Sequence, residues 1–502
     1  MTPKASLARI GGSLGAALLT IGLAPIAGPA SPAAADPALD WSACALDSLA
    51  ADDIECATMT VPMDRNDATG PTFALAVLRH RSSGTPEQRI GSLFVNPGGP
   101  GGAGSDVIAP IWSILPEAVR KRFDLVTWDP RGTGLTRPVL TRCASPWPDR
   151  PDTGPVGWRR VIADFRTALR PINAACQERN AAFIEHIGTN EAVADLDRLR
   201  AAVGDEKLTY WGISYGTRIG YVYALAHPDR IRAVILDGSI DPAGTLASLT
   251  DGGAAPDQAF GSFADAFPQA AQQLTEVLAV LDTRTQPLPG GRQLTRWDVL
   301  DTVYGPIAAQ GAYVTISEQI ATMHTAVLGS GEEQQQAAKE LAKAVRDTRR
   351  QPSGAAGGMF AVVNCLDYPQ RPGLDQITRR VVQQVRYAPR YGGSLATMFG
   401  TNCAGFTFAP DPVPVITGQG PAVPLMIAGS TRDGSTIVQW TARMSRAFPA
   451  SRTVTYAGGQ HAVWNIAGSA CVDRVLDTYI LTLRRPAADR ACPNAYRPPE
   501  AE

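Results

Sequence analysis

The sequence predicts an α/β protein with a mostly parallel, doubly wound sheet and an inserted helical lid. Short apolar strands alternate with amphipathic helices over residues 90–241, which is typical of a parallel sheet. Beyond residue 242 helical stretches replace this alternation, and strands resume only at 424–429. We therefore expect a first core part at 36–241, a helical lid at 242–420 and a second core part at 421–502.

The core begins with a predicted hairpin, because apolar segments at 55–63 and 72–79 flank a turn rich in Asn, Asp, Gly and Pro. Later segments are predicted from apolar runs or from apolar residues at helical spacing. Strands are expected at 90–95, 123–128, 208–211, 233–236, 424–429 and 452–456, and helices at 190–203, with Asn190 as N-cap, and at 268–281, 317–327, 332–346 and 472–483. We expect an irregular tail after Arg485.

A Gly-x-Ser-x-Gly pentapeptide at 212–216 joins the strand at 208–211 to a helix that ends near His227. When a strand, a turn and a helix follow one another in this way, the serine occupies a sharp, strained turn that presents its hydroxyl at the edge of the sheet. The same pattern occurs at 11–15, but there it lies in an apolar N-terminal stretch without a strand or a helix start. The context therefore indicates Ser214 as a nucleophile, and the backbone N–H of Tyr215 as an oxyanion donor.

Glycines dominate the segment at 96–104, directly after a predicted strand. It lacks the Lys-Ser or Lys-Thr of a phosphate-binding loop and does not open a dinucleotide-binding helix. A plain tight turn is the simplest alternative. We favour an oxyanion loop, in which glycines let a backbone N–H approach a substrate carbonyl.

A serine nucleophile needs a base and an acid that orients the base. In proteins with such a turn, the serine, the acid and the histidine follow one another in this order along the chain. His80 and His186 precede Ser214 and are therefore excluded as the base. Of the later histidines, His227 lies at a helix end and His324 in the predicted lid, whereas His461 follows the last core strand. We expect His461 as the base and Asp433 as the acid, with Asp237 as the alternative acid.

Composition and the N-terminus indicate export. The formal net charge of the 502 residues is -1, which argues against nucleic acid as the main partner. Lys4 and Arg9 precede an apolar run that ends in alanines at 33–35, as in a secretory signal cleaved near Ala35. A membrane anchor is the alternative for this run, and no later segment is apolar enough to span a bilayer.

All eight cysteines follow the predicted cleavage site, and an even number in an oxidising compartment suggests four disulfides. Eight cysteines allow 105 pairings. We expect neighbours to pair because this closes short loops: Cys44–Cys56, Cys143–Cys176, Cys365–Cys403 and Cys471–Cys492. Their spacing shows no metal-binding Cys-x-x-Cys.

With these motifs in place, the sequence resembles the secreted tripeptidyl aminopeptidases of actinomycete bacteria, in the proline-iminopeptidase-like branch of the α/β-hydrolase fold. The resemblance covers nearly the whole mature chain, and its most specific segments are 96–101, 128–134 and 212–217. It implies that Ser214, His461 and Asp433 form a catalytic triad, that Gly99 and Tyr215 supply the oxyanion donors, and that no metal or organic cofactor takes part.

Three segments depart from the family pattern. Ser435, Thr436 and Ile437 replace its usual Thr-Pro pair, Gln460 and Ala462 flank the histidine in place of small residues, and 261–267 lacks an expected cysteine. These departures leave the triad intact and concern substrate preference.

An exopeptidase of this kind takes the free N-termini of peptides or proteins as its substrate, so the lid should supply a carboxylate for the ammonium group. Asp367 and Glu318 are the candidates. A secreted ester or amide hydrolase with the same triad is the alternative enzyme, and a binding protein that kept the fold without activity is the alternative outside enzymes.

Overall fold

The structure is a computed structural model that describes residues 38–45, 53–141, 143, 157–350 and 355–499. The predicted signal at 1–35 and its cleavage site lie outside these residues. Among the described helices, none is both long and apolar enough to cross a membrane.

A ten-stranded sheet forms the centre of the described chain, in the order β1-β2-β3-β5-β4-β6-β7-β10-β11-β12. The first three strands pair antiparallel, β3 also joins β5 antiparallel, and every pairing from β5 to β12 is parallel. The strands are β1 (Ser42–Ala43), β2 (Ile54–Pro62), β3 (Thr72–His80), β4 (Gly91–Asn96), β5 (Phe123–Trp128), β6 (Leu208–Ile213), β7 (Ile231–Asp237), β10 (Met426–Ser430), β11 (Arg452–Tyr456) and β12 (Arg490–Cys492). The predicted mostly parallel sheet is confirmed.

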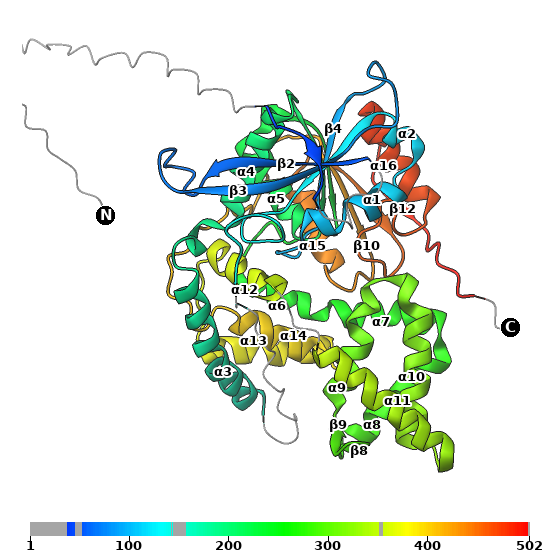
Figure 1. The fold of residues 1–502 in the computed structure, drawn as a ribbon. Coiled ribbons are helices and arrows are strands. Elements are labelled where there is room, and N and C mark those ends of the chain that lie inside the picture. The colour runs from blue at the N-terminus through cyan, green and yellow to red at the C-terminus, as the bar shows by residue number, and fades with distance from the viewer. Residues whose placement is uncertain (1–37, 46–52, 142, 144–156, 351–354, 500–502) are drawn as a thin grey trace, which may run out of the picture. The chain divides into compact units, whose positions relative to one another are not determined.

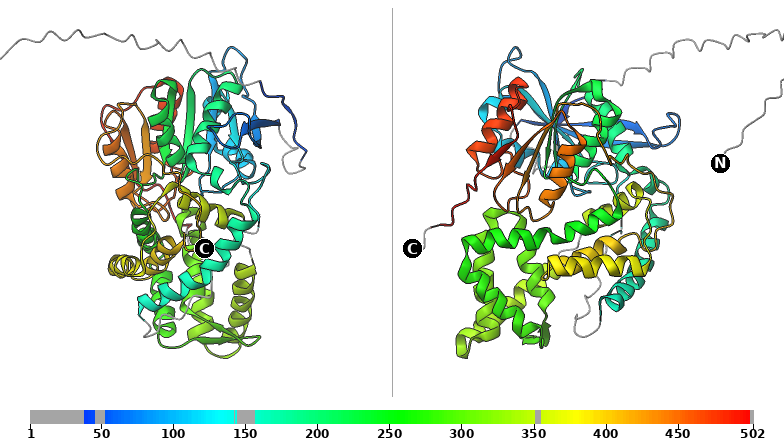
Figure 2. Two further views of the ribbon diagram at one scale, coloured as in Figure 1. Left: turned by 90° about the vertical axis from the view of Figure 1, so that its left-hand side faces the viewer. Right: turned by 180° about the vertical axis from the view of Figure 1, so that it is seen from behind.

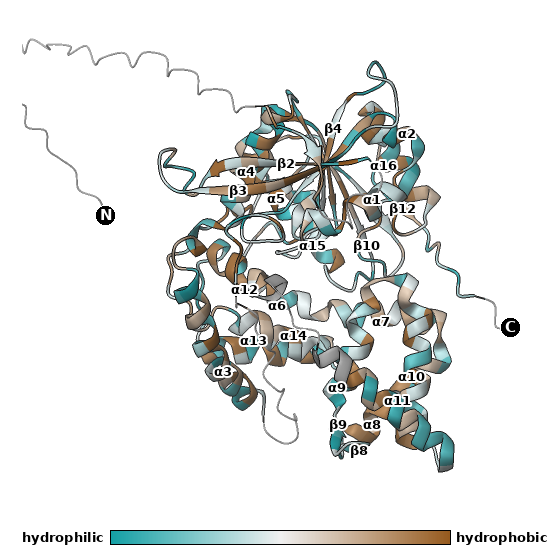
Figure 3. Cartoon of the chain, viewed as in Figure 1, coloured by the Kyte–Doolittle hydropathy of each residue, from teal (hydrophilic) through white to brown (hydrophobic). Residues whose placement is uncertain are grey.

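Helices cover both faces of this sheet (Figure 1). Leu196, Ile219 and Met444 pack on one face, from α4 (Thr189–Ala202), α5 (Gly216–Ala226) and α15 (Val438–Ala447). Helices α1 (Ile108–Ile114), α2 (Glu117–Arg120) and α16 (Ala470–Thr482) pack on the other face. Strands β4, β5, β6 and β10 are buried along their whole length, which explains why apolar residues predominate in their sequences. Figure 3 shows hydrophobic residues, in brown, where the strands of the sheet converge.

The inserted helices between β7 and β10 lie below the sheet in the views of Figures 1 and 2. They are α6 (Leu246–Asp251), α7 (Ala255–Ala266), α8 (Pro268–Leu281), α9 (Arg296–Tyr304), α10 (Tyr313–Leu328), α11 (Gly331–Arg350), α12 (Ala355–Asp367), α13 (Leu374–Tyr387) and α14 (Gly392–Thr401), with short 3-10 turns and a small hairpin of β8 (Gln286–Leu288) and β9 (Arg292–Leu294). Residues of α7 to α11 share one apolar cluster.

Helix α3 (Trp158–Arg179) precedes the predicted boundary at residue 242 but packs with the inserted helices. Its Ile162 shares a buried cluster with Ile377 and Val381 of α13 and Ala396 of α14. The sequence reasoning assigned no element to this segment. The division of the chain at residue 242 stays a prediction, and α3 is the part of the first core segment that leaves the sheet.

Two expectations at element ends were wrong. Asn190 is not the N-cap of α4, because the helix begins one residue earlier and follows Gly188. The Asn190 side chain instead donates to the backbone carbonyls of Asp411 and Pro412. The tail after Arg485 is not wholly irregular, since β12 adds a parallel edge strand to β11. The Cys471–Cys492 bond ties that edge to α16.

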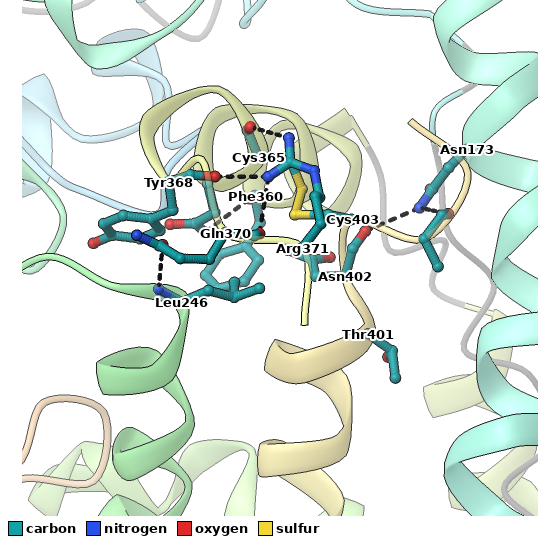
Figure 4. Close-up of a disulfide and its surroundings, with 12 residues drawn as sticks. Asn173, Leu246, Phe360, Cys365, Tyr368, Gln370, Arg371, Thr401, Asn402 and Cys403 are labelled. Atoms are coloured by element: carbon teal, nitrogen blue, oxygen red, sulfur yellow. Dashed lines mark hydrogen bonds between the residues drawn. A yellow bond between two sulfur atoms is a disulfide. The ribbon is translucent and has the colours of Figure 1, made fainter. Parts of the chain in front are cut away.

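The four predicted disulfides are confirmed, and they close loops of 12, 33, 38 and 21 residues. Cys365–Cys403 joins α12 to the segment after α14 (Figure 4). Beside it, Arg371 donates to the backbone carbonyls of Cys365, Tyr368 and Gln370. The guanidinium therefore binds one carbonyl of the last turn of α12 and two carbonyls of the segment that follows the helix.

Candidate active site

Ser214 occupies the turn between β6 and α5 in a left-handed conformation, with φ of 56°, which is uncommon for a residue with a side chain. The turn is tight enough to require its flanking glycines. A Cβ on Gly212 would lie 2.4 Å from the Gly216 carbonyl oxygen, and one on Gly216 would lie 2.6 Å from the Asn96 carbonyl oxygen. The serine is half-buried, so a strained turn presents its hydroxyl as the pentapeptide predicted.

The glycine-rich loop after β4 lies directly on this turn. A Cβ on Gly98 would come within 2.9 Å of the Ser214 Cβ and 3.0 Å of the Tyr215 nitrogen. Gly98 and Gly99 have φ of 95° and 105°, a region that glycine adopts readily. Among the hydrogen bonds of the described chain, none uses the N–H of Gly99 or Tyr215 as donor. Both donors thus belong to backbone beside Ser214 and are uncommitted, as an oxyanion hole requires.

His461 and Asp433 form a hydrogen-bonded pair. The ring Nδ1 lies 2.9 Å from each carboxylate oxygen of Asp433, which is completely buried. Asp433 also accepts from the backbone N–H of Ser435 at 2.7 Å and of Thr436 at 2.8 Å, and from the Thr436 hydroxyl at 3.1 Å. The segment that departs from the family's Thr-Pro pattern therefore supplies three donors that fix the acid.

This pair sets the protonation of the imidazole. Burial by itself lowers the pKa of His461, but the charge and hydrogen bond of Asp433, with the charge of Asp237, raise that pKa above its ordinary value. A carboxylate that accepts from Nδ1–H leaves Nε2 as the ring atom able to take a proton. The side chain of His461 is 19% exposed, whereas that of Asp433 is buried.

Residues 237 and 238 connect Ser214 to this pair. The Ser214 N–H donates to the Asp237 carbonyl at 2.9 Å, and a Cβ on Gly238 would lie 3.0 Å from Cε1 of His461. The serine turn and the histidine ring therefore flank the same two residues at the end of β7. The structure brings Ser214, Asp433, His461, Tyr215 and the Gly99 loop into one site.

The alternative acid, Asp237, has different partners. Its carboxylate accepts from the backbone N–H of Val463 at 2.9 and 3.0 Å and of Trp464 at 3.0 Å. No hydrogen bond of the described chain joins it to the His461 ring. Burial raises the pKa of Asp237 to about 6, against the lowering effect of these two N–H groups.

The inserted segment also forms hydrogen bonds to the loop that carries His461, and the sequence did not predict these contacts. The His461 N–H donates to the Ala308 carbonyl at 2.7 Å, and the Gln310 N–H donates to Oε1 of Gln460 at 3.0 Å. The Gln310 side chain in turn accepts from the Tyr456 hydroxyl at 2.8 Å. These partners lie about 150 positions apart in the chain, so no local pattern could have indicated them.

The two predicted amine-binding acids lie in different surroundings. Asp367 is buried and pairs with Arg218 at 2.7 Å, and its oxygens also accept from the N–H and hydroxyl of Thr189 at 3.0 and 2.6 Å. Glu318 is exposed on α10. Asp367 therefore takes over the capping of α4 that was expected from Asn190, and it holds the buried guanidinium of α5.

One cluster in the described chain has the composition of a metal site, namely Asp64, His186 and Glu191, whose ligand atoms lie within 4.8 Å of one another. Glu191 is already paired with Arg65 at 2.8 Å and Arg131 at 3.1 Å. Two guanidinium groups on the buried carboxylate oppose a further cation. The cluster is best described as an ion-pair network between the β2–β3 turn and α4.

Comparison with known proteins shows the family to which this chain belongs. Residues 91–286 match the family model described as alpha/beta hydrolase fold, and residues 388–492 match the model described as TAP-like protein. Tripeptidyl aminopeptidase of Streptomyces lividans is 30% identical over 485 residues, which cover 91% of this chain and 87% of that protein. The chain belongs to the tripeptidyl aminopeptidase family of α/β hydrolases.

Two other relatives match a similarly large share of this chain but carry different names. Serine protease Hip1 of Mycobacterium tuberculosis is 29% identical over 462 residues, which cover 87% of each chain. A protein named carboxylesterase B, also from Mycobacterium tuberculosis, is 29% identical over 507 residues, covering 92% of this chain and 91% of that protein. As a tripeptidyl aminopeptidase family member with this fold, the chain is a serine hydrolase.

Proposed function

We propose that this protein is an exported serine exopeptidase that releases short peptides, three residues long by analogy with its relatives, from the free N-termini of peptides or proteins. The observation that carries the proposal is the joining of the Ser214 turn, the uncommitted N–H groups of Gly99 and Tyr215, and the His461–Asp433 pair in one site. Relatives named tripeptidyl aminopeptidase and serine protease support the peptide substrate.

In this scheme Ser214 Oγ attacks the carbonyl carbon of the scissile peptide bond while Nε2 of His461 accepts the hydroxyl proton. Asp433 holds the ring and stabilises the imidazolium. The N–H groups of Gly99 and Tyr215 donate to the oxyanion, and each such donor is worth about 3 kcal/mol. His461 returns the proton to the leaving amine, and a water molecule then hydrolyses the acyl-enzyme with His461 again as base. The scheme uses no metal or organic cofactor.

Export is the second part of the proposal. Four disulfides are typical of proteins in oxidising compartments, and the N-terminal run predicts cleavage near Ala35. N-terminal sequencing of the protein recovered from the culture medium should begin near Asp36. Recovery of the uncleaved chain in the membrane fraction would contradict export.

The described contacts give no support to either of the two acids that the sequence suggested for the substrate ammonium, Asp367 and Glu318. Asp367 would have to leave Arg218 to bind a substrate, and separating a buried ion pair costs several kcal/mol. Glu318 is exposed on a helix whose buried face packs within the α7–α11 cluster. We therefore give neither residue an amine-binding role in the scheme.

The test compares tripeptide p-nitroanilides that carry a free or an acetylated N-terminus, with the mature protein and with Ser214→Ala. Cleavage of the free-amine substrate alone, lost in Ser214→Ala, is the expected result. Equal cleavage of acetylated substrates and of simple esters would instead favour a secreted ester or amide hydrolase, the alternative suggested by the relative named carboxylesterase B.

A further inference from the structure

We propose that Asp237 is a positioning residue for the catalytic base, because its carboxylate holds the loop that carries His461 in its working conformation and places a second negative charge beside the ring. This inference rests on the proposed role of His461 as the base. It concerns a residue at the end of β7 that takes no part in the triad itself.

The contacts of Asp237 are those of a buried acceptor. Its side chain is completely buried and accepts from the backbone N–H groups of Val463 and Trp464, which begin two positions after His461. The Trp211 indole N–H adds a longer contact at 3.4 Å. Each of these partners is a donor, so the ionised carboxylate fits the site and a protonated acid or an amide would bring an unwanted donor into it.

The loop needs this support because its backbone is strained. Ala462 and Asn465 have φ of 56° and 55°, a region that Asn tolerates but that costs a residue such as Ala462 about 1–2 kcal/mol. Such conformations persist when surrounding contacts hold them. Asp237 binds both residues between these two positions, and Trp464 packs edge-on against Trp211 of β6, with ring centroids 4.7 Å apart.

The other groups that contact the loop bind atoms other than the Val463 and Trp464 backbone N–H groups. Asp433 binds the ring, Asp473 accepts from the Asn465 N–H at 2.8 Å, and Asp477 accepts from the Trp464 indole at 2.9 Å. From the inserted segment, the uncharged Ala308 and Gln310 contact His461 and Gln460. Burial raises the pKa of Asp473 and of Asp477. Of the acids that hold the loop backbone, only Asp237 is among the charges that raise the pKa of His461.

Two measurable effects follow from this arrangement. Replacing one acceptor oxygen of Asp237 with an amide donor should let the loop shift and lower kcat, because a displacement of about 1 Å can cost up to a hundredfold in rate. Loss of the Asp237 charge should lower the pKa of His461 and move the acid limb of the pH–rate profile to lower pH. A residue with only a structural role would leave the acid limb unchanged.

The experiment compares Asp237→Asn with the wild type and with Asp205→Asn in the full mature protein. Asp205 is a matched control because it is a half-buried aspartate that also accepts a backbone N–H, from Ser92 at 2.8 Å, but it lies before β6, at the opposite end of the strand from Ser214. We measure kcat, KM and the acid limb of kcat/KM with the free-amine tripeptide p-nitroanilide and a p-nitrophenyl ester.

We expect Asp237→Asn to lower kcat by between about tenfold and a hundredfold, to change KM little, and to shift the acid limb downward, with Asp205→Asn like the wild type. A folded Asp237→Asn with wild-type kcat and acid limb would overturn the inference. So would a loss as large as that of Asp433→Asn, which would make Asp237 a member of the triad.

The rate at which a fluorophosphonate labels Ser214, measured against pH, keeps this test separate from the proposed substrate. Labelling depends on the base and not on peptide recognition. If the wild type labels and cleaves the ester but not the tripeptide, the exopeptidase proposal fails while the labelling rates of Asp237→Asn still decide the role of Asp237. Wild-type labelling without dependence on His461 would overturn both.

Discussion

The turns after β7 and β10 offer two versions of the same sequence feature, an Asp-Gly pair at the end of a buried parallel strand. Asp237 and Asp433 are both completely buried. Asp433 accepts from Nδ1 of His461 and from three donors in its own turn. Asp237 accepts from the backbone after the histidine instead.

The difference arises from the position of each residue along its strand. Asp237 is the last residue of β7 and pairs in register with Ala428, inside β10, whereas Asp433 comes three residues after β10 ends. Asp433 thus lies beyond the edge of the sheet, where it meets the imidazole, and Asp237 stays beneath the loop. A strand-end aspartate therefore indicates the edge of a site, but the length of its strand decides which atoms it meets.

The largest expected effect comes from Asp433→Asn, which keeps the shape of the acid but removes its charge and replaces one acceptor oxygen with an NH2 donor, so that the ring can be held in the wrong tautomer. We expect kcat to fall by roughly 10⁴, while circular dichroism shows a folded protein. The fall in kcat of Asp433→Asn should be much larger than that of Asp237→Asn measured in the same way. A fall of less than a hundredfold in Asp433→Asn would break the division of roles between the two acids.

A third buried acid sharpens the comparison, because the carboxylate of Asp367 pairs with a guanidinium in addition to the N–H and hydroxyl of Thr189. Arg218→Met should lower the free energy of unfolding by about 3–5 kcal/mol, since it leaves the Asp367 carboxylate buried without its cation. Urea unfolding measures the change. The control is Arg160→Met, which removes an exposed pair with Asp164 and should change stability by at most about 0.5 kcal/mol.

The charges of the two strand-end acids predict the pH dependence of the wild type. A protonated His461 cannot accept the serine proton, so kcat/KM should fall as pH drops through the pKa of His461. Because Asp433 and Asp237 raise that pKa, the acid limb should lie above the ordinary histidine value of about 6.5. A limb clearly below that value would show that burial outweighs the two carboxylates.

The smallest expected effect, on stability and on kcat, comes from a substitution at Ala462, the strained residue in the loop that Asp237 helps to hold. Ala462→Gly relieves the left-handed conformation but adds entropy to the unfolded chain, so we expect stability within about 1 kcal/mol of the wild type and nearly unchanged kcat. Ala462→Val places a β-branched side chain at positive φ and should lose both stability and activity. Equal behaviour of the two variants in urea unfolding and in kcat would indicate that the loop backbone is not held in this conformation.

Local sequence determined the features in which one short segment specifies its own geometry. The serine turn follows from a strand, two flanking glycines and a helix, and the parallel strands follow from buried apolar runs such as 123–128. Pairing of neighbouring cysteines was also correct, because each disulfide closes a loop within one stretch of chain.

Only the tertiary structure decided which distant groups satisfy one another. The N-terminus of α4 receives its acceptor from Asp367 rather than from Asn190, helix α3 joins the inserted helices, and Ala308 binds the histidine loop. Buried donors and acceptors must be paired, and any correctly placed segment can supply the partner. The sequence could therefore suggest candidate residues for the chemistry, whereas packing between distant segments decided which residues hold those candidates in place.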